Sequence, residues 1–317
     1  MRNKFAEVLY KISKKNKKIR VVAADISPAG KMAELSKKYP DRFINVGVAE
    51  SSMISMCAGL AMHGFKPFAY TIASFALFRP FEMVRIDIGY QNLPVVIVGM
   101  GAGTVYSTLG GTHITPEDVS VVRCLPNFKV LVPCDSKELA SMLIYLCKNN
   151  KSPCYLRIGK SGEKDYSDKS NDKWEIGKPR IILDGKKDIC LVASGPIIRF
   201  YFSIIKELKK KKIFPTIISY HTLKPLNDIN NYKFFKKFKS IITLEDISEI
   251  NGLSQIIKGM CYDHNYRGLL FSFALKDKNI KNYGTQDDLL KDHGITAKNI
   301  YNKILSFNKK INSKKTN

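Results

Sequence analysis

The stretch NVGVAESSMISMCAGLAM, residues 45–62, carries the pattern on which the fold prediction depends. A short strand-like run ends at Glu50, and a nearly uncharged segment rich in Ala, Gly and Met follows it. This composition predicts a helix over 50–63 that is buried on most sides. Glu50 then stands at the start of that helix. It either stabilises the helix dipole or points into a cleft as a functional acid, and the pattern alone leaves both readings open.

The rest of the chain alternates short β-branched runs with amphipathic segments, which predicts an α/β fold with two doubly wound domains. We expect a first domain over residues 1–160, a linker over 161–187, a second domain over 188–308, and a basic disordered tail over 309–317. In the first domain we expect strands at 19–24, 67–72, 94–100, 129–133 and 154–158, and helices at 3–13, 50–63, 79–90 and 136–148. In the second we expect strands at 188–194, 215–220, 239–244 and 268–274, and helices at 196–210, 252–261 and 296–307.

Composition limits the class of protein. The chain has 317 residues, 44% of them hydrophobic, and no run approaches the roughly 18 apolar residues of a membrane span. The polar N-terminus lacks the apolar core of a signal peptide. Seven dispersed cysteines without a CxxC pair are typical of reduced thiols. We therefore expect a cytoplasmic protein with no membrane partner.

The formal net charge of +24 comes mainly from lysine, in runs at 14–18, 209–212 and 309–315. These runs are not interleaved with aromatic residues, as a base-stacking surface would require. We expect solvated lysine-rich faces and no nucleic-acid partner. Attraction of anionic substrates or of an acidic partner is the alternative reading.

Two further segments are candidates for chemistry. Phe75, Phe78 and Phe81 recur at a spacing of three close behind a predicted strand, so they either pack in the core or form a ligand platform at the end of that strand. The glycines of 99–103 do not match the GxGxxG order, so they give only weak support for phosphate binding. His113 follows two glycines and a threonine, and is either an active-site histidine on a loop or a structural one.

The order of these segments resembles that of the transketolases. Similarity to the thiamine-diphosphate (ThDP) pyrimidine-binding domain of that family lies in residues 42–50, 58–61, 64–67, 93–95, 111–113, 123–127 and 132–135. Similarity to the transketolase C-terminal domain lies in residues 192–196, 221–226 and 251–254. The resemblance covers nearly the whole chain and implies these two domains.

Full-length transketolases also carry an N-terminal domain that holds the cofactor diphosphate and its divalent metal through a Gly-Asp-Gly motif. No segment here matches that motif. The resemblance therefore implies the C-terminal subunit of a split transketolase, active only with an N-terminal diphosphate-binding subunit. It implies thiamine diphosphate as cofactor, Mg²⁺ or another divalent metal on the partner, no metal ligands in this chain, and a heterotetramer with two copies of each subunit.

The resemblance also implies roles for individual residues. Glu50 would hydrogen-bond N1′ of the aminopyrimidine and thereby promote loss of the thiazolium proton. Phe78 would stack on that ring, and His113 would line the substrate channel and stabilise an oxyanion or bind a sugar hydroxyl. The other residues expected at the site are Phe75 and Phe81 in the aromatic pocket, Asp25 near the cofactor at the subunit boundary, and Arg157 and Arg2 at the substrate.

Two departures from the family pattern concern the substrate. Leu109 stands where an Asp usually contacts a sugar hydroxyl, and Gly101 where a His or Arg usually helps to hold a phosphate. We therefore expect transfer of a two-carbon ketol unit between sugars, with a deoxy, unphosphorylated or nucleotide-linked sugar among them. The alternatives are a deoxyxylulose-phosphate synthase-like carboligase and the beta subunit of a 2-oxo acid dehydrogenase. A binding protein that has lost catalysis and a basic nucleic-acid binder are more distant alternatives.

Overall fold

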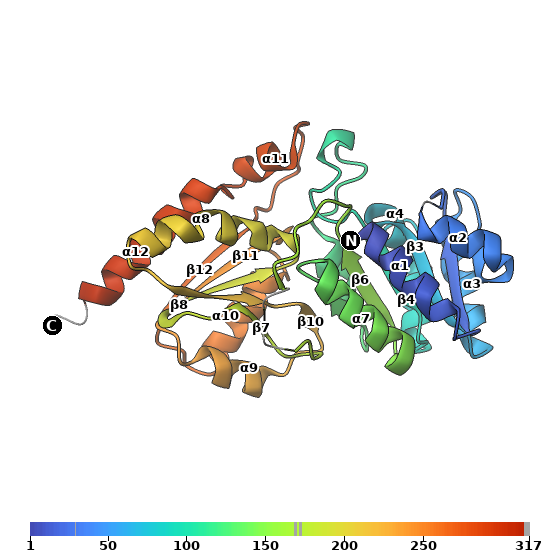
Figure 1. Cartoon of the computed structure of the whole chain (residues 1–317), viewed down its shortest axis with the longest axis horizontal. Coiled ribbons are helices and arrows are strands. Elements are labelled where there is room, and N and C mark those ends of the chain that lie inside the picture. The colour runs from blue at the N-terminus through green and yellow to red at the C-terminus, as the bar shows by residue number, and fades with distance from the viewer. Residues whose placement is uncertain (29, 168–169, 171–172, 314–317) are drawn as a thin grey trace.

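Two sheets, each almost entirely parallel, form the frame of the computed structural model (Figure 1). The structure describes residues 1–28, 30–167, 170 and 173–313. Helices cover both faces of each sheet, so the chain has the doubly wound α/β architecture that the alternating pattern predicts. None of the helices in the described part of the chain combines the length and apolar character needed to cross a bilayer.

The first sheet has the strand order β10-β5-β6-β4-β3-β1-β2. Its parallel strands are β1 (Ile19–Ala23), β2 (Phe43–Asn45), β3 (Lys66–Ile72), β4 (Val96–Met100), β5 (Lys129–Leu131) and β6 (Cys154–Ile158). Alternate residues of these strands face opposite sides. Val21 and Ala23 join one core cluster, whereas Val22 and Ala24 join the other.

The helices of the first domain divide between these two faces. On the side of Val21 lie α1 (Arg2–Ser13), α2 (Lys31–Lys38) and α7 (Ser136–Asn149). On the side of Val22 lie α3 (Glu50–Met62), α4 (Ala73–Leu77), α5 (Phe81–Met83), the π-helix η2 (Val84–Tyr90) and α6 (Asp118–Arg123). Short 3-10 turns, η1 (Pro40–Arg42) and η3 (Ser107–Leu109), complete the domain. Met53, Ile54 and Cys57 of α3 are fully buried, as the composition predicts. The helix is not buried on most sides, however, since Met56 and Met62 on its other face are 39% and 56% exposed.

One strand of the first sheet comes from the second domain. β10 (Thr222–Lys224) pairs antiparallel with β5, and Thr222 lies opposite Leu131. The backbone N–H of Val132 donates to the carbonyl of His221 at 2.8 Å, which extends the pairing. β10 therefore covers the edge of the first sheet that β5 would otherwise expose.

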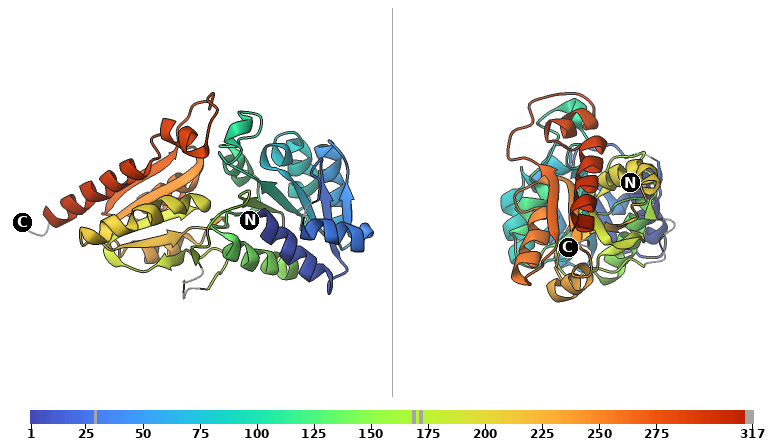
Figure 2. Two further views of the ribbon diagram at one scale, coloured as in Figure 1. Left: turned by 45° about the horizontal axis from the view of Figure 1, so that its top comes forward. Right: turned by 90° about the vertical axis from the view of Figure 1, so that its left-hand side faces the viewer.

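The second sheet has the order β12-β11-β8-β9-β7. Its strands are β7 (Arg180–Leu183), β8 (Lys186–Ser194), β9 (Pro215–Ser219), β11 (Ser240–Ser248) and β12 (Leu269–Leu275), and all but β7 pair in parallel. After the turn η5 (Pro196–Ile198), α8 (Arg199–Lys210) packs with α12 (Ala297–Ser313) on one face (Figure 2). The remaining helices are α9 (Asp228–Phe235) and α10 (Leu253–Asp263) on the other face, and α11 (Gln286–Asp292).

The structure differs from the expected boundaries at several points. The strand β7 lies inside the segment expected to link the domains, and it forms an edge of the second sheet. The helix α12 continues through residues 309–313, where a tail is expected, because Ile311 extends the buried stripe of Ile304 and Phe307. The rest of the expected tail, 314–317, lies outside the described residues. The helix expected over 79–90 begins at Phe81 and is largely the π-helix η2.

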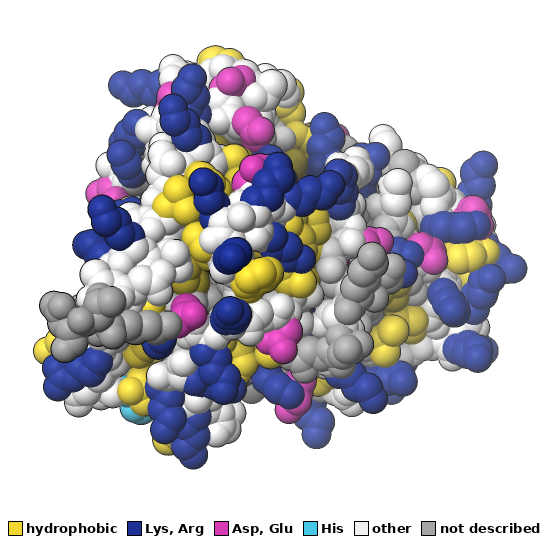
Figure 3. Space-filling view, turned by 60° about the vertical axis from the view of Figure 1, so that its left-hand side comes forward, with side chains coloured by type: hydrophobic (Ala, Val, Ile, Leu, Met, Phe, Trp, Pro, Cys, Tyr) yellow, Lys and Arg dark blue, Asp and Glu magenta, His cyan; other side chains and the backbone are white. Residues whose placement is uncertain are grey.

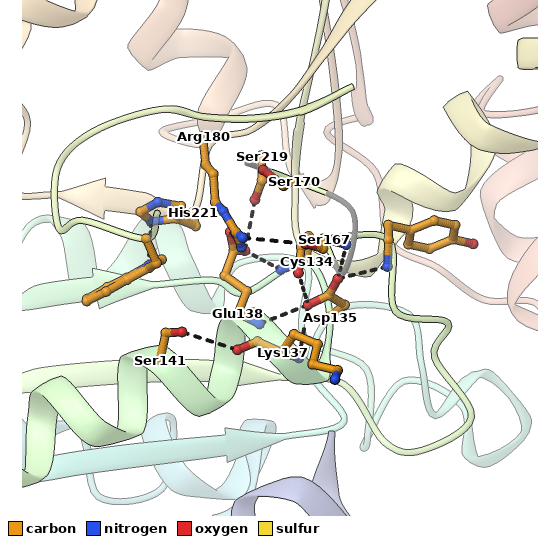
Figure 4. A network of polar contacts seen from close by, with 12 residues as sticks. Cys134, Asp135, Lys137, Glu138, Ser141, Ser167, Ser170, Arg180, Ser219 and His221 are labelled. Carbon is orange, nitrogen blue, oxygen red and sulfur yellow. Dashed lines mark hydrogen bonds and ion pairs between the residues drawn. The ribbon is translucent and has the colours of Figure 1, made fainter. Parts of the chain in front are cut away.

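A buried polar network ties α7 to the connecting segment and to the second sheet (Figure 4). Asp135 caps α7 and also accepts hydrogen bonds from the backbone N–H and the hydroxyl of Ser167, at 2.6 and 2.8 Å. Glu138 accepts from the hydroxyl of Ser219 at 2.9 Å and lies 3.6 Å from a guanidinium nitrogen of Arg180. Burial raises the pKa of Glu138. The two domains are thus joined through side chains as well as through β10.

Candidate functional site

The predicted site residues gather at one edge of the first sheet. Asp25 follows β1, Glu50 begins the helix after β2, Phe75 lies in α4 directly after β3, and Gly101 follows β4. The carboxyl ends of parallel strands share one edge, which is where open α/β sheets bind ligands. The topology therefore brings together residues that the sequence separates.

Glu50 is buried and paired with an arginine. The side chain is 4% exposed, and Nη1 of Arg79 donates to its two carboxylate oxygens at 3.0 and 3.2 Å. Arg79 itself is 51% exposed and follows α4, so its guanidinium reaches Glu50 from the outer side of the site. A buried carboxylate is costly without such a partner. The pairing with Arg79 had no counterpart in the sequence prediction.

The three phenylalanines have different environments. Phe75 is half-buried, and the Arg79 guanidinium lies 4.4 Å from the centroid of its ring. Phe78 ends α4 and is 41% exposed, three residues beyond Phe75 and so on nearly the same side of the helix. Phe81 belongs to the next helix, α5, and packs against the core cluster on the α3 side. The spacing of three is thus broken at Pro80, and only Phe75 and Phe78 present an aromatic surface from α4.

His113 lies next to Phe75, at the end of a loop that follows β4. The two ring centroids are 5.1 Å apart in an edge-to-face arrangement. Nδ1 of His113 is 2.8 Å from the hydroxyl of Thr112. Glu50, Arg79, Phe75 and His113 therefore form a continuous series of contacts, which places the two predicted catalytic residues in one site.

Tyr106 is a residue of this site that the sequence prediction missed. Its ring is 8% exposed and makes an edge contact with His113, with centroids 6.1 Å apart. Gly101 has φ +65°, and a Cβ there would lie 2.0 Å from Cε2 of Tyr106. Nζ of Lys160 lies 5.1 Å from the centre of the same ring. Tyr106 thus occupies the space that a side chain at position 101 would need, and this signal is visible only in three dimensions.

The two predicted substrate arginines lie in different surroundings. The backbone N–H of Arg2 donates to the carbonyl of Lys160 at 3.0 Å. Burial raises the pKa of Tyr106, and the charge of Arg2 opposes that rise, so Arg2 lies close to the site edge. Arg157 is 3% exposed, and its Nε and Nη1 donate to Asp118 and Asp246 at 2.9 and 2.8 Å. Its charge is therefore balanced inside the protein.

Asp25 is exposed beyond the end of β1 and has a left-handed backbone, with φ +56°. A non-glycine residue in this conformation is uncommon and is found mostly in turns and at functional sites. The side chain is thus free of the sheet and lies at the edge where the other site residues gather.

A cavity of about 520 Å³ lies between the two domains, beside the end of β6. Residues from both domains line it, among them Ala102, Arg157, Lys160, Arg199, Asp246 and Gln286.

In the described part of the chain, no group of three or more His, Cys, Asp and Glu side chains is arranged to hold a metal ion. Lysines and arginines are scattered over the face shown in Figure 3, between acidic, uncharged and hydrophobic side chains.

Family models match both domains. Residues 1–162 match the transketolase pyrimidine binding domain, and residues 177–300 match the transketolase C-terminal domain. A protein of Methanocaldococcus jannaschii named as a transketolase C-terminal section is 31% identical over 312 residues, which cover 98% of this chain and 96% of that protein. An apulose-4-phosphate transketolase subunit from Phocaeicola vulgatus is 26% identical, over 98% of this chain and 97% of its own length.

A longer relative matches over part of its length. The 1-deoxy-D-xylulose-5-phosphate synthase of Alkaliphilus oremlandii is 29% identical over 94% of this chain, which spans 47% of that enzyme. Among solved structures, a split gene transketolase described as an inactive beta4 tetramer has a TM-score of 0.85 and 28% identity, over 96% of this chain and 97% of that one. The family models over both domains, together with the relatives that match nearly end to end, show that this chain belongs to the transketolase family.

Proposed function

We propose that this chain is the pyrimidine-binding subunit of a two-chain transketolase-type enzyme, which transfers a two-carbon ketol unit between sugars with thiamine diphosphate. The observation that carries the proposal is the series of contacts from Glu50 through Arg79 and Phe75 to His113. It places a buried acid, an aromatic surface and a histidine at the ligand-binding edge of the sheet.

The side chains at this edge fit an aminopyrimidine ring. The ring nitrogen needs an acid, and Glu50 offers carboxylate oxygens whose partner, Arg79, is half exposed and can move away. The flat ring needs an apolar surface, and α4 presents Phe75 and the exposed ring of Phe78. When bound, thiamine diphosphate supplies the electron sink that allows a ketose carbon–carbon bond to break and form again.

The chain's own residues then have separate tasks. Glu50 holds the proton at the ring nitrogen. For this, Arg79 must release at least one of the two Glu50 carboxylate oxygens to which it donates. Because the Thr112 hydroxyl engages Nδ1 of His113, Nε2 is the nitrogen available to a substrate oxygen. The rings of Phe75 and Tyr106 hold the imidazole on two sides, which fixes its orientation toward the substrate.

The diphosphate and its divalent metal, Mg²⁺ or another, are proposed to lie on a partner subunit. The solved relative that supports this arrangement is described as an inactive beta4 tetramer of a split gene transketolase. We propose a heterotetramer with two copies of each subunit. Asp25, exposed at the site edge, lies where it can face the partner.

The substrate is proposed to be a sugar other than the usual pentose and hexose phosphates. Tyr106 fills the space beside Gly101, and Leu109 presents a hydrophobic side chain that is 48% exposed. Arg2 and Lys160 remain as cations near this pocket. Relatives named for apulose 4-phosphate and for 6-deoxy-6-sulfo-D-fructose support an unusual acceptor or donor.

The second candidate is a deoxyxylulose-phosphate synthase-like carboligase. The similarity to such synthases over 94% of this chain favours it. The two functions differ in the donor, which is a ketose for the transferase and a 2-oxo acid for the carboligase.

Reconstitution with a diphosphate-binding subunit tests the proposal. Glu50→Gln should abolish turnover and leave the complex intact on size-exclusion chromatography, whereas the exposed control Glu82→Gln should keep both. Retained turnover in Glu50→Gln would overturn the role of Glu50. Ordinary transketolase rates on xylulose 5-phosphate with ribose 5-phosphate would contradict the unusual sugar, and turnover only with pyruvate as donor would favour the carboligase.

A further inference from the structure

The loop that carries His113 is closed at its base by two hydrogen bonds between Gly103 and Thr115. It belongs to the connection between β4 and α6, residues 101–117. The N–H of Gly103 donates to the hydroxyl of Thr115 at 3.0 Å, and the N–H of Thr115 donates to the carbonyl of Gly103 at 2.9 Å. His113 lies two residues before this closure, so its position depends on how the closed loop is held.

The second domain holds the base of this loop. Arg157, under the loop, donates from Nη1 to the carboxylate of Asp246 at 2.8 Å and from Nη2 to its carbonyl at 3.1 Å. Gly103 packs directly on this pair, since a Cβ there would lie 2.4 Å from Arg157 Nη2 and from Asp246 Oδ2. The N–H of Ser248 also donates to the carbonyl of Pro116 at 2.8 Å. Asp246 and Ser248 both belong to β11.

The second domain also holds the tip of the loop, through the segment that leads into α11 (Figures 1 and 2). A Cβ at Gly110 would lie 2.4 Å from Cε1 of Tyr283, so the ring packs on the turn itself. Gly110 has φ +73°, and its carbonyl accepts the N–H of His113 at 3.0 Å. The same segment also reaches the base of the loop, because Nε2 of Gln286 donates to the hydroxyl of Thr104, next to Gly103, at 3.1 Å.

We propose that the second domain positions His113, with Asp246 and Gln286 holding the base of the loop and Tyr283 holding its tip. These are positioning residues, since they act on the substrate only through the loop. The inference rests on the proposed role of His113 at the substrate. The second domain then has two roles toward the first domain. It covers the β5 edge of the first sheet, and it holds the loop that carries His113.

Histidine resonances of the full chain test this inference without substrate or partner. The chain has five histidines, so selective isotope labelling gives a simple NMR spectrum in which His113→Gln identifies the His113 signal. Tyr283→Ala and Gln286→Ala should shift or broaden that signal and leave those of His221 and His264 in place. Amide exchange of residues 103–115 should become roughly tenfold faster or more. Asp287→Asn is the matched control, because Asp287 neighbours Gln286 but pairs with Arg199.

The outcomes separate the inference from the proposed function. An unchanged His113 signal and unchanged exchange of the loop in folded Tyr283→Ala and Gln286→Ala proteins would overturn the positioning role. Asp246→Asn also probes the base, and the variants Tyr283→Ala and Gln286→Ala keep the test decisive if Asp246→Asn does not fold. In the reconstituted enzyme, Gln286→Ala alone should lower turnover. Added to His113→Asn, it should lower turnover no further than His113→Asn does by itself. An active His113→Asn enzyme would count against the proposed function and leave the NMR result standing.

Discussion

Nη1 of Arg79 donates to both carboxylate oxygens of Glu50, at 3.0 and 3.2 Å, from a side chain that is itself half exposed. The free chain thus keeps its proposed cofactor-activating acid paired with a cation. A ring nitrogen that binds Glu50 must compete with Arg79 for one of these oxygens.

Arg79→Ala should lower the free energy of unfolding of the isolated chain by about 1 kcal/mol, because it leaves a buried carboxylate without its partially solvated partner. In the reconstituted complex the variant should bind thiamine diphosphate at least as tightly as the natural protein, since the competitor is gone. Urea denaturation and a fluorescence titration measure the two effects. Arg85→Ala, at an exposed site on η2, is the control. Cofactor binding weakened by tenfold or more would show instead that Arg79 contacts the cofactor.

Replacing Arg157 by methionine should cost about 3–5 kcal/mol of stability, because Asp118 and Asp246 would remain buried without their shared cation. Burial disfavours the charge of Arg157, but the two carboxylates outweigh it and raise the pKa of the arginine. Urea denaturation measures the change. Lys239→Ala, which removes an exposed ion pair with Asp188, should cost at most about 1 kcal/mol. Equal losses in the two variants would contradict the role assigned to Arg157.

Gly101→Ala should destabilise the protein mainly by displacing the ring of Tyr106, which lies 2.0 Å from the added Cβ. We expect a cost of about 2–3 kcal/mol in the natural background, and about 1 kcal/mol in Tyr106→Ala, where only the strain of φ +65° remains. A double-mutant cycle by denaturation gives the coupling. Additive losses would show that Tyr106 does not fill this space.

The stability of the chain should depend on Glu245 between about pH 4.5 and 7. Burial raises the pKa of Glu245 to about 7, although the N–H groups of Leu253 and Ser254 oppose the rise. The folded chain therefore binds this proton more tightly than the unfolded chain, so the contribution of Glu245 to stability falls as the pH rises through this window. Denaturation at pH 5 and pH 7.5 should show a smaller loss on raising the pH in Glu245→Gln than in the natural protein. An identical pH dependence would contradict the raised pKa.

Local patterns predicted much of the fold because most elements carry their own periodicity. The helix after Glu50 is an example, since Met53, Ile54 and Cys57 pack in the core on the sheet, as its apolar residues predict. The strand β10 could not be predicted in this way. It is three residues long, and its partner β5 lies in the other domain, so no local signal marks it.

The sequence predicts which candidate site residues lie together where neighbouring positions and the ends of parallel strands determine it. Glu50, Phe75 and His113 come together because the parallel sheet aligns the ends of its strands. The surroundings of Arg157 depend on Asp118 and Asp246, which are 39 and 89 positions away, and no spacing rule reaches that far. Phe81 is partly buried against the core rather than beside Phe78 because the helix is interrupted at Pro80.

The way β10 completes the first sheet also determines where this protein can be divided. A fragment that stops after the pyrimidine-binding domain would lose Thr222 and leave Val130 and Leu131 on an open strand edge. Such an edge is a template for pairing with other chains. Anyone who wishes to dissect this protein, graft its domains onto relatives or express them separately should therefore transfer residues 221–224 together with the first domain.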